Sequence, residues 1–138
     1  MLSKTPDIAA LQAKALQFRR EILETISLAG SGHPGGSLSA VEIFLSLYFY
    51  KIKHKPDDPK WEDRDRVIVS KGHVSPVVYV TLANAGYFPK EELKTFRKFK
   101  SRLQGHVVTK VPGVEFNTGS LGHGLSFANG VALGAKMK

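Results

Sequence analysis

Apolar side chains recur every three or four positions from residue 8 to residue 26. They are Ile8, Leu11, Ala15, Phe18, Ile22 and Ile26. This spacing places one apolar stripe on one face of an amphipathic helix. Thr5 followed by Pro6 marks its beginning, because proline fits the first helical position, and Gly30 marks its end. We therefore expect a long helix with one buried face.

The next hydrophobic segment, residues 41–49, is apolar on nearly every side. A helix of this composition is buried over most of its surface. Ser39 and Glu42 have the spacing of a capping box, which opens a helix. The preceding residues 31–37 include three glycines and a proline, and this composition predicts a loop.

Residues 66–70, Arg-Val-Ile-Val-Ser, have the pattern of a short, fully buried strand of the parallel kind. A helix is expected from about Val74 to Ala85, and a basic helix is expected to begin at Pro89. Residues 101–119 predict a loop, and a helix of small residues follows the glycines that end at Gly124.

These elements predict an α/β protein that is helix-rich with at least one parallel-type strand. A lone parallel strand leaves its backbone N–H and C=O groups unpaired, which is costly in a core, and parallel sheets need several strands. We therefore expect residues 1–138 to be a single, incomplete domain, either a fragment or one subunit of a larger assembly.

The composition is that of an ordinary globular domain, 42% hydrophobic and 23% charged. The net charge of +8 favours anionic ligands. Much of it lies in residues 90–102, which we interpret as the solvated face of a helix. No nucleic-acid motif, membrane span or signal peptide is recognised. The absence of cysteine fits a reducing cytoplasm and excludes thiolate metal ligands.

Four of the five histidines directly follow a glycine. Glycine permits left-handed turns and close approach of a ligand, and imidazole exchanges protons near neutral pH. The pattern therefore predicts one polar pocket lined by several loops. The exception is His54, which we expect to be a solvated residue of a linker over residues 51–66.

Each Gly-His turn has a functional and a structural interpretation. Pro34 would hold His33 in an extended conformation, where it could shuttle a proton or simply cap a turn. Residues 70–73 lie between a strand and a helix, where phosphate binds, although the same pattern also occurs in plain scaffolds. Residues 104–106 indicate a surface loop. Residues 119–124 suit a phosphate or cofactor turn, or a close helix crossing.

Four motifs together resemble those of the transketolases, in the same order along nearly the whole chain. They are Ser31-Gly32-His33-Pro34-Gly35-Gly36-Ser37, Asp65-Arg66-Val67-Ile68-Val69-Ser70-Lys71-Gly72-His73, Gly105-His106 and Thr118-Gly119-Ser120-Leu121-Gly122-His123-Gly124. The chain looks most like the N-terminal subunit of the split, two-chain transketolases, or the start of a full-length one. The resemblance implies a thiamine diphosphate enzyme that moves a two-carbon ketol unit between sugar phosphates of the pentose phosphate pathway.

The resemblance also implies roles for individual residues. His33 matches a substrate-binding, catalytically important histidine, and His106 matches a further catalytic histidine near substrate. The positions that match cofactor-binding residues are His73, Gly119, Ser120 and Leu121. His123 stands where many members carry glutamine, so no role is implied for it.

Other parts of the family pattern are absent from these residues. The Gly-Asp-Gly motif and asparagine that hold Mg²⁺ would lie beyond residue 138, as would the aminopyrimidine-binding domain and its activating glutamate. We therefore expect no metal ligand in this chain and little or no activity from the chain alone. The implied partners are sugar phosphates and a C-terminal subunit, or the remainder of the chain, in a homo-oligomer (a dimer, for example) or a heterotetramer.

Three alternatives remain at this point. A deoxyxylulose-phosphate synthase-like thiamine enzyme would share the early Gly-His loop, but its typical motifs lack the His-Pro-Gly-Gly and Ser-Leu-Gly-His-Gly forms. A non-catalytic remnant or interaction module would use the small-residue last helix for close packing. A nucleic-acid binder would show affinity that falls steeply with salt.

Overall fold

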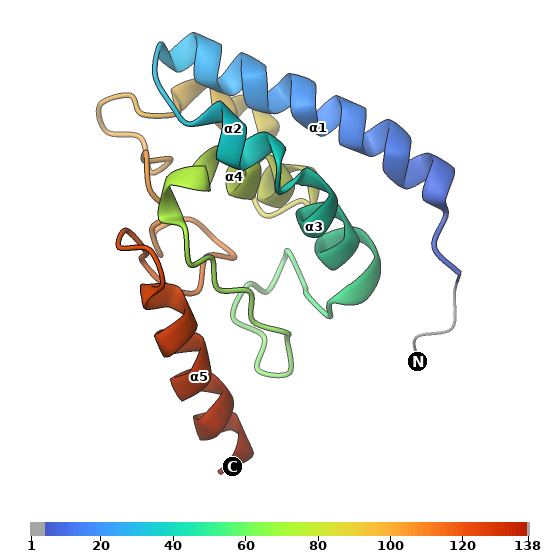
Figure 1. The fold of residues 1–138 in the computed structure, drawn as a ribbon, viewed down its shortest axis with the longest axis vertical. Coiled ribbons are helices and arrows are strands. Elements are labelled where there is room, and N and C mark those ends of the chain that lie inside the picture. Colours follow the sequence, from blue (N-terminus) through green and yellow to red (C-terminus); the bar gives the residue numbers. More distant parts are fainter. Residues whose placement is uncertain (1–4, 138) are drawn as a thin grey trace.

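The computed structural model describes residues 5–137, which form a helical body and one helix that stands apart (Figure 1). The α-helices are α1 (Ile8–Ala29), α2 (Pro34–Leu38), α3 (Val41–Ser46), α4 (Ser75–Asn84) and α5 (His123–Lys136). A π-helical turn, η1 (Leu47–Lys51), continues α3, and two 3₁₀ helices, η2 (Gly72–Val74) and η3 (Lys90–Thr95), flank α4. No helix within residues 5–137 has the length and apolar character that a membrane crossing requires.

The first helix confirms the predicted amphipathic pattern. Its buried face includes Phe18 and Ile22, and Gly30 ends it with a left-handed φ of 65°. The N-cap is Asp7 and not Thr5, because the Asp7 carboxylate accepts the N–H of Ala10 at 3.0 Å. The buried stripe is shorter than expected, since Ile8 at the start of the helix is 57% exposed.

Helix α4 is the centre of the core, and α1, α2, α3 and η3 all pack against it. It is buried along nearly its whole length because its side chains are apolar on every face. The fully buried large side chains of the core include Phe18, Tyr79, Leu82, Phe96 and Leu103. Because α4 follows the Gly72 turn directly, this rigid core fixes the position of that turn.

Two local predictions between α1 and α3 are wrong. Residues 31–37 are not wholly a loop, since Pro34 occupies the first position of α2, where its missing N–H costs nothing. Ser39 does not cap the next helix: its hydroxyl donates to Gly36 O at 3.1 Å, and the N-cap of α3 is Ala40. The α2 carbonyl competes successfully for the serine hydroxyl, as short side chains often bond to nearby backbone.

No strand occurs among residues 5–137, so the strand predicted at residues 66–70 is not confirmed. The segment is half-buried over Val67, Ile68 and Val69. A strand is defined by backbone pairing with a neighbour, and here the Val69 carbonyl accepts the hydroxyl of Thr118 at 2.7 Å. The similarity of the whole body to solved structures, given below, fits the α/β class.

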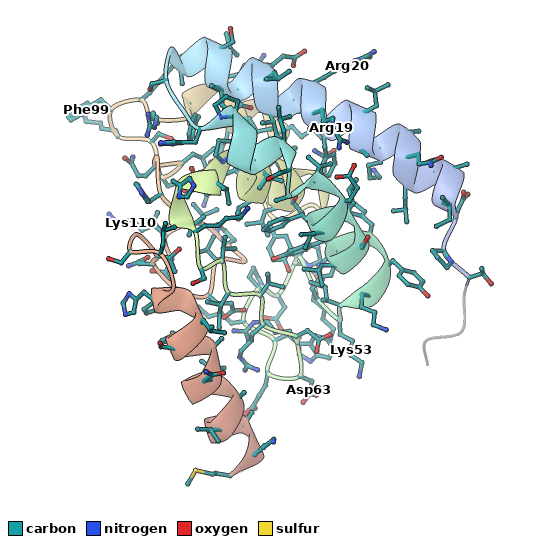
Figure 2. All side chains as sticks on the ribbon, viewed as in Figure 1. Arg19, Arg20, Lys53, Asp63, Phe99 and Lys110 are labelled. Atoms are coloured by element: carbon teal, nitrogen blue, oxygen red, sulfur yellow. The ribbon has the colours of Figure 1, made fainter. Side chains whose placement is uncertain are left out.

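The basic segment forms a shorter helix than expected. After η3, turns at Arg97 and Lys100 have left-handed φ values of 60° and 64°. Arg102 forms a bidentate pair with Glu92, so the cations are partly neutralised and are not simply the solvated face of a helix. Phe99 is 92% exposed and points away from the body (Figure 2).

Glu21 joins α1 to α4 and η3. Its carboxylate accepts hydrogen bonds from Gln17, Asn84 and Lys90. Burial raises the pKa of this carboxyl, but the three hydrogen bonds outweigh burial and hold the pKa below its ordinary value of 4.5. The resulting stabilisation is present above pH 4.5 and is lost as the pH falls through the lowered pKa of the folded state.

Glu21→Gln is therefore expected to reduce the free energy of unfolding by about 1 kcal/mol at neutral pH, because a part-exposed charged hydrogen bond is lost. It should also flatten the decline of stability towards acid pH. Urea unfolding at neutral and acid pH measures both effects. Glu24→Gln, at an exposed position of the same helix, is the control, and identical acid profiles for the two variants would contradict this account.

Candidate functional site

His33 and His73, which are 40 positions apart, meet at the N-terminal end of α2. Their ring centroids are 5.2 Å apart, and the ring planes form an angle of 68°. His33 is the N-cap of α2 and has the extended backbone that Pro34 favours, with φ −117° and ψ 87°. The predicted convergence of distant Gly-His turns is therefore confirmed for this pair.

Gly36 of α2 lies against the same imidazole. A Cβ atom at this position would lie 2.9 Å from Val74 Cγ1 and 3.6 Å from His73 Nε2. Lys71 reaches the same residue from the neighbouring turn, and its Nζ donates to Gly36 O at 3.5 Å. Glycine therefore lets the turn of residues 70–73 pack closely on α2 and leaves both polar side chains beside it.

The turn that precedes α5 packs on the turn of residues 70–73 with almost no clearance. A Cβ atom at Gly72 would lie 2.0 Å from Thr118 O. The N–H of Gly122 donates to Ser70 O at 3.3 Å, and the N–H of Leu125 donates to Ser70 Oγ at 3.2 Å. These contacts fix the start of α5 on the site, although the rest of the helix stands away from the body (Figure 1).

Gly119, Ser120 and Leu121 are exposed at the tip of this turn, and nothing lies within 4 Å of the Cβ position of Gly119. Their backbone N–H groups meet no acceptor among residues 5–137. Successive free N–H groups on an exposed turn form a concavity that suits an anion. The three predicted cofactor-binding positions therefore offer hydrogen-bond donors and open space.

The loop that carries His106 lies beside the His73 turn. The N–H of Val107 donates to Gly72 O at 3.2 Å, and Ser75 Oγ donates to Gly105 O at 2.9 Å. Tyr79 donates its hydroxyl to His106 O at 3.0 Å, and burial raises the pKa of this phenol, which keeps it protonated as a donor. The His106 side chain is exposed, so the backbone is fixed while the imidazole faces solvent.

The remaining histidines lie elsewhere. The prediction that His54 is a solvated linker residue is wrong: it is half-buried, its Nε2 lies 2.9 Å from Tyr48 O, and its Nδ1 lies 3.2 Å from Tyr87 Oη. No local sequence pattern indicates this contact, since the tyrosines lie on separate elements. His123 packs against Phe116, with ring centroids 5.3 Å apart.

Sequence reasoning assigned no role to Lys71 or Thr118. Both lie inside motifs that the resemblance identified, yet only the folded chain shows that they bridge separate turns. Within residues 5–137 no three His, Cys, Asp or Glu side chains gather closely enough to hold a metal ion. The site is therefore a set of imidazoles, one ammonium group and backbone N–H donors, which suits an anionic ligand.

Residues 11–138 match the family described as the transketolase, thiamine diphosphate binding domain. One of the two subunits of the apulose-4-phosphate transketolase from Phocaeicola vulgatus is 42% identical over 130 residues, which cover 94% of this chain and 46% of that relative. Human transketolase is 40% identical over 129 residues, which cover 94% of this chain and 21% of the relative. The chain thus spans less than half the length of these relatives.

The solved structures show the same similarity. The crystal structure of transketolase from Campylobacter jejuni superposes with a TM-score of 0.90 at 39% sequence identity, over 95% of this chain and 21% of the other. The arrangement of helices and turns described above is therefore shared with a solved protein along nearly all of the chain.

Proposed function

The chain belongs to the family of transketolase thiamine diphosphate-binding domains, and on this premise we propose that it forms the diphosphate-binding part of a transketolase. The complete enzyme transfers a two-carbon ketol unit between sugar phosphates. The relatives named above are a transketolase and part of a split transketolase, which favours this function over a deoxyxylulose-phosphate synthase. The meeting of His33 and His73 at 5.2 Å is the structural observation on which the proposal rests.

The described residues fit the diphosphate end of the cofactor. His73 supplies a side-chain donor, and Gly119, Ser120 and Leu121 supply backbone N–H donors beside open space. The bound cofactor supplies the carbanion nucleophile of the reaction. A magnesium ion does not fit these residues by themselves, because no carboxylates gather at the site, and Mg²⁺ would need ligands from outside residues 5–137.

His33 and His106 are the proposed catalytic residues. Both imidazoles are accessible to solvent, so each could exchange a proton with a substrate hydroxyl. Their backbones are held by contacts that do not use the rings: Ser37 Oγ donates to His33 O, and Tyr79 Oη donates to His106 O. The rings are therefore available for hydrogen bonds to substrate.

The proposed enzyme is completed by a second polypeptide segment, either a C-terminal subunit or further residues of the same chain, in a homo-oligomer such as a dimer or in a heterotetramer. Residues 66–70 would then pair with a strand from that segment, because their backbone has no ladder partner within residues 5–137. We place the assembly in the cytoplasm and in the pentose phosphate pathway. The absence of cysteine is consistent with that compartment.

Turnover of the complete enzyme tests the assignments. His33→Ala is expected to lower kcat by about 100-fold with little change in cofactor affinity, because a positioned proton-transfer group is worth about 10²–10⁴ in rate. His73→Ala is expected to weaken both. Steady-state kinetics and calorimetry with thiamine diphosphate and Mg²⁺ separate these effects.

Two outcomes would count against the proposal. Equal turnover of His33→Ala and wild type would remove His33 from the catalytic site. The chain alone is expected to bind thiamine diphosphate weakly or not at all, because Mg²⁺ lacks its ligands. Micromolar binding by the chain alone would refute the need for a completing segment.

A further inference from the structure

Lys71 carries a half-buried ammonium group with no carboxylate partner among residues 5–137. An ammonium has three N–H donors. Its one hydrogen bond within the described part of the chain is the long 3.5 Å contact to Gly36 O. Removing a charge partly from water is costly unless it is paired or fully hydrogen-bonded, so this placement is unfavourable without a further partner.

The surroundings of Lys71 indicate which partner would suit it. Gly36 is the common neighbour of the Lys71 ammonium and of His73 Nε2, and His73 in turn faces His33. Residues 70–73 also carry the turn of residues 118–122 through the Gly122 bond to Ser70. One cation, two imidazoles and free backbone donors therefore surround one space and present no acid to it.

We propose that Lys71 is an anion-binding residue that contacts a phosphate-type group held between α2 and the turn of residues 70–73. The assignment deepens the proposed function and rests on it, since a diphosphate is the anion expected there. It adds a residue that the family motifs did not supply. The lysine would neutralise the terminal charge, while the backbone donors of residues 119–121 orient the group.

A purely structural role for Lys71 would predict something different. A neutral–charged hydrogen bond at 3.5 Å is at the long end of the useful range, so its loss should hardly change the free energy of unfolding. A role in anion binding predicts that the charge matters for ligand affinity and that stability without ligand does not change. The two roles are therefore separated by measuring binding and unfolding on the same variants.

The test is an NMR titration of the isotope-labelled 138-residue chain with inorganic pyrophosphate. Wild type is expected to show saturable shifts of the His33, Gly36 and His73 signals, with millimolar affinity. Lys71→Met should weaken binding by about tenfold, the size of one hydrogen bond to a charged group. Lys71→Arg should retain most of the affinity. Lys51→Met removes an equal charge from an exposed residue that ends η1, and it should bind like wild type.

Each outcome decides the proposal. Equal affinity of wild type and Lys71→Met, or no saturable shifts in wild type, overturns it; unchanged signals of the unbound variant verify the fold. A parallel titration of the completed enzyme with thiamine diphosphate separates the two claims. Lys71-dependent pyrophosphate binding without cofactor binding would sink the proposed function and leave the anion site, whereas cofactor binding that ignores Lys71 would do the reverse.

Discussion

Replacing Gly72 by alanine is expected to disrupt both the fold and the site. The new methyl group would lie 2.0 Å from Thr118 O and 2.6 Å from Thr118 C, which are backbone atoms with no freedom to rotate away. The two turns must therefore separate. Overpacking costs about 1–3 kcal/mol or more, and the Thr118 hydrogen bond to Val69 O adds about 1 kcal/mol. A total of about 3–4 kcal/mol is a large part of a typical domain's stability.

Urea unfolding measures this loss, and nuclear Overhauser contacts between the His33 and His73 rings report the site. Both should decline together in Gly72→Ala, because the turn carries His73. Gly130→Ala is the matched control: nothing lies within 4 Å of its Cβ position inside α5, so alanine should be neutral or stabilising there. Wild-type stability in Gly72→Ala would show that the close packing of the two turns is wrong.

Periodicity predicted the helices that form the core. In α1 the spacing of Phe18 and Ile22 requires no information from elsewhere in the chain, because a helix buries one face against any apolar neighbour. The boundaries were less predictable, since caps depend on single hydrogen bonds. Asp7 capped α1 where Thr5 was expected, and Ser39 bonded to the helix before it.

The strand prediction failed to be confirmed for a different reason. The composition of residues 66–70 describes a side-chain environment, whereas a strand also needs a backbone partner. Among residues 5–137 the segment is contacted by a threonine hydroxyl and by backbone N–H groups of the α5 turn. A local pattern carries no information about whether a pairing strand is at hand.

The site was predictable as a set of residues but not as a geometry. Glycine before histidine indicated tight turns, and His33 and His73 do meet. The same pattern did not indicate that Gly36, Gly72 and Gly124 permit the close contacts between separate turns. It also missed Lys71, because a lysine inside a motif becomes informative only when its neighbours in space are known.

The ion pair between Arg64 and Glu115 holds the two site turns side by side. Arg64 Nε and Nη2 each donate to a Glu115 carboxylate oxygen at 2.7 Å, and Arg64 Nη1 donates to Trp61 O at 2.7 Å. The side chains are only 13% and 16% exposed. The hydrogen bond with Glu115 raises the pKa of Arg64 further above its ordinary value. Arg64 lies just before residues 66–72, and Glu115 lies just before the turn that begins at Thr118.

Arg64→Met is therefore expected to destabilise the chain by about 2–3 kcal/mol, because a largely buried carboxylate loses its partner. Glu115→Met should cost a similar amount for the same reason. The double variant should cost clearly less than the sum, since methionine packs without charge at both positions and no unpaired ion remains. Urea unfolding of the four proteins gives the coupling energy. Additive losses would mean that the pair does not act as a clamp, whereas coupled losses accompanied by weaker His33–His73 contacts would show that it aligns the turns on which the proposed site depends.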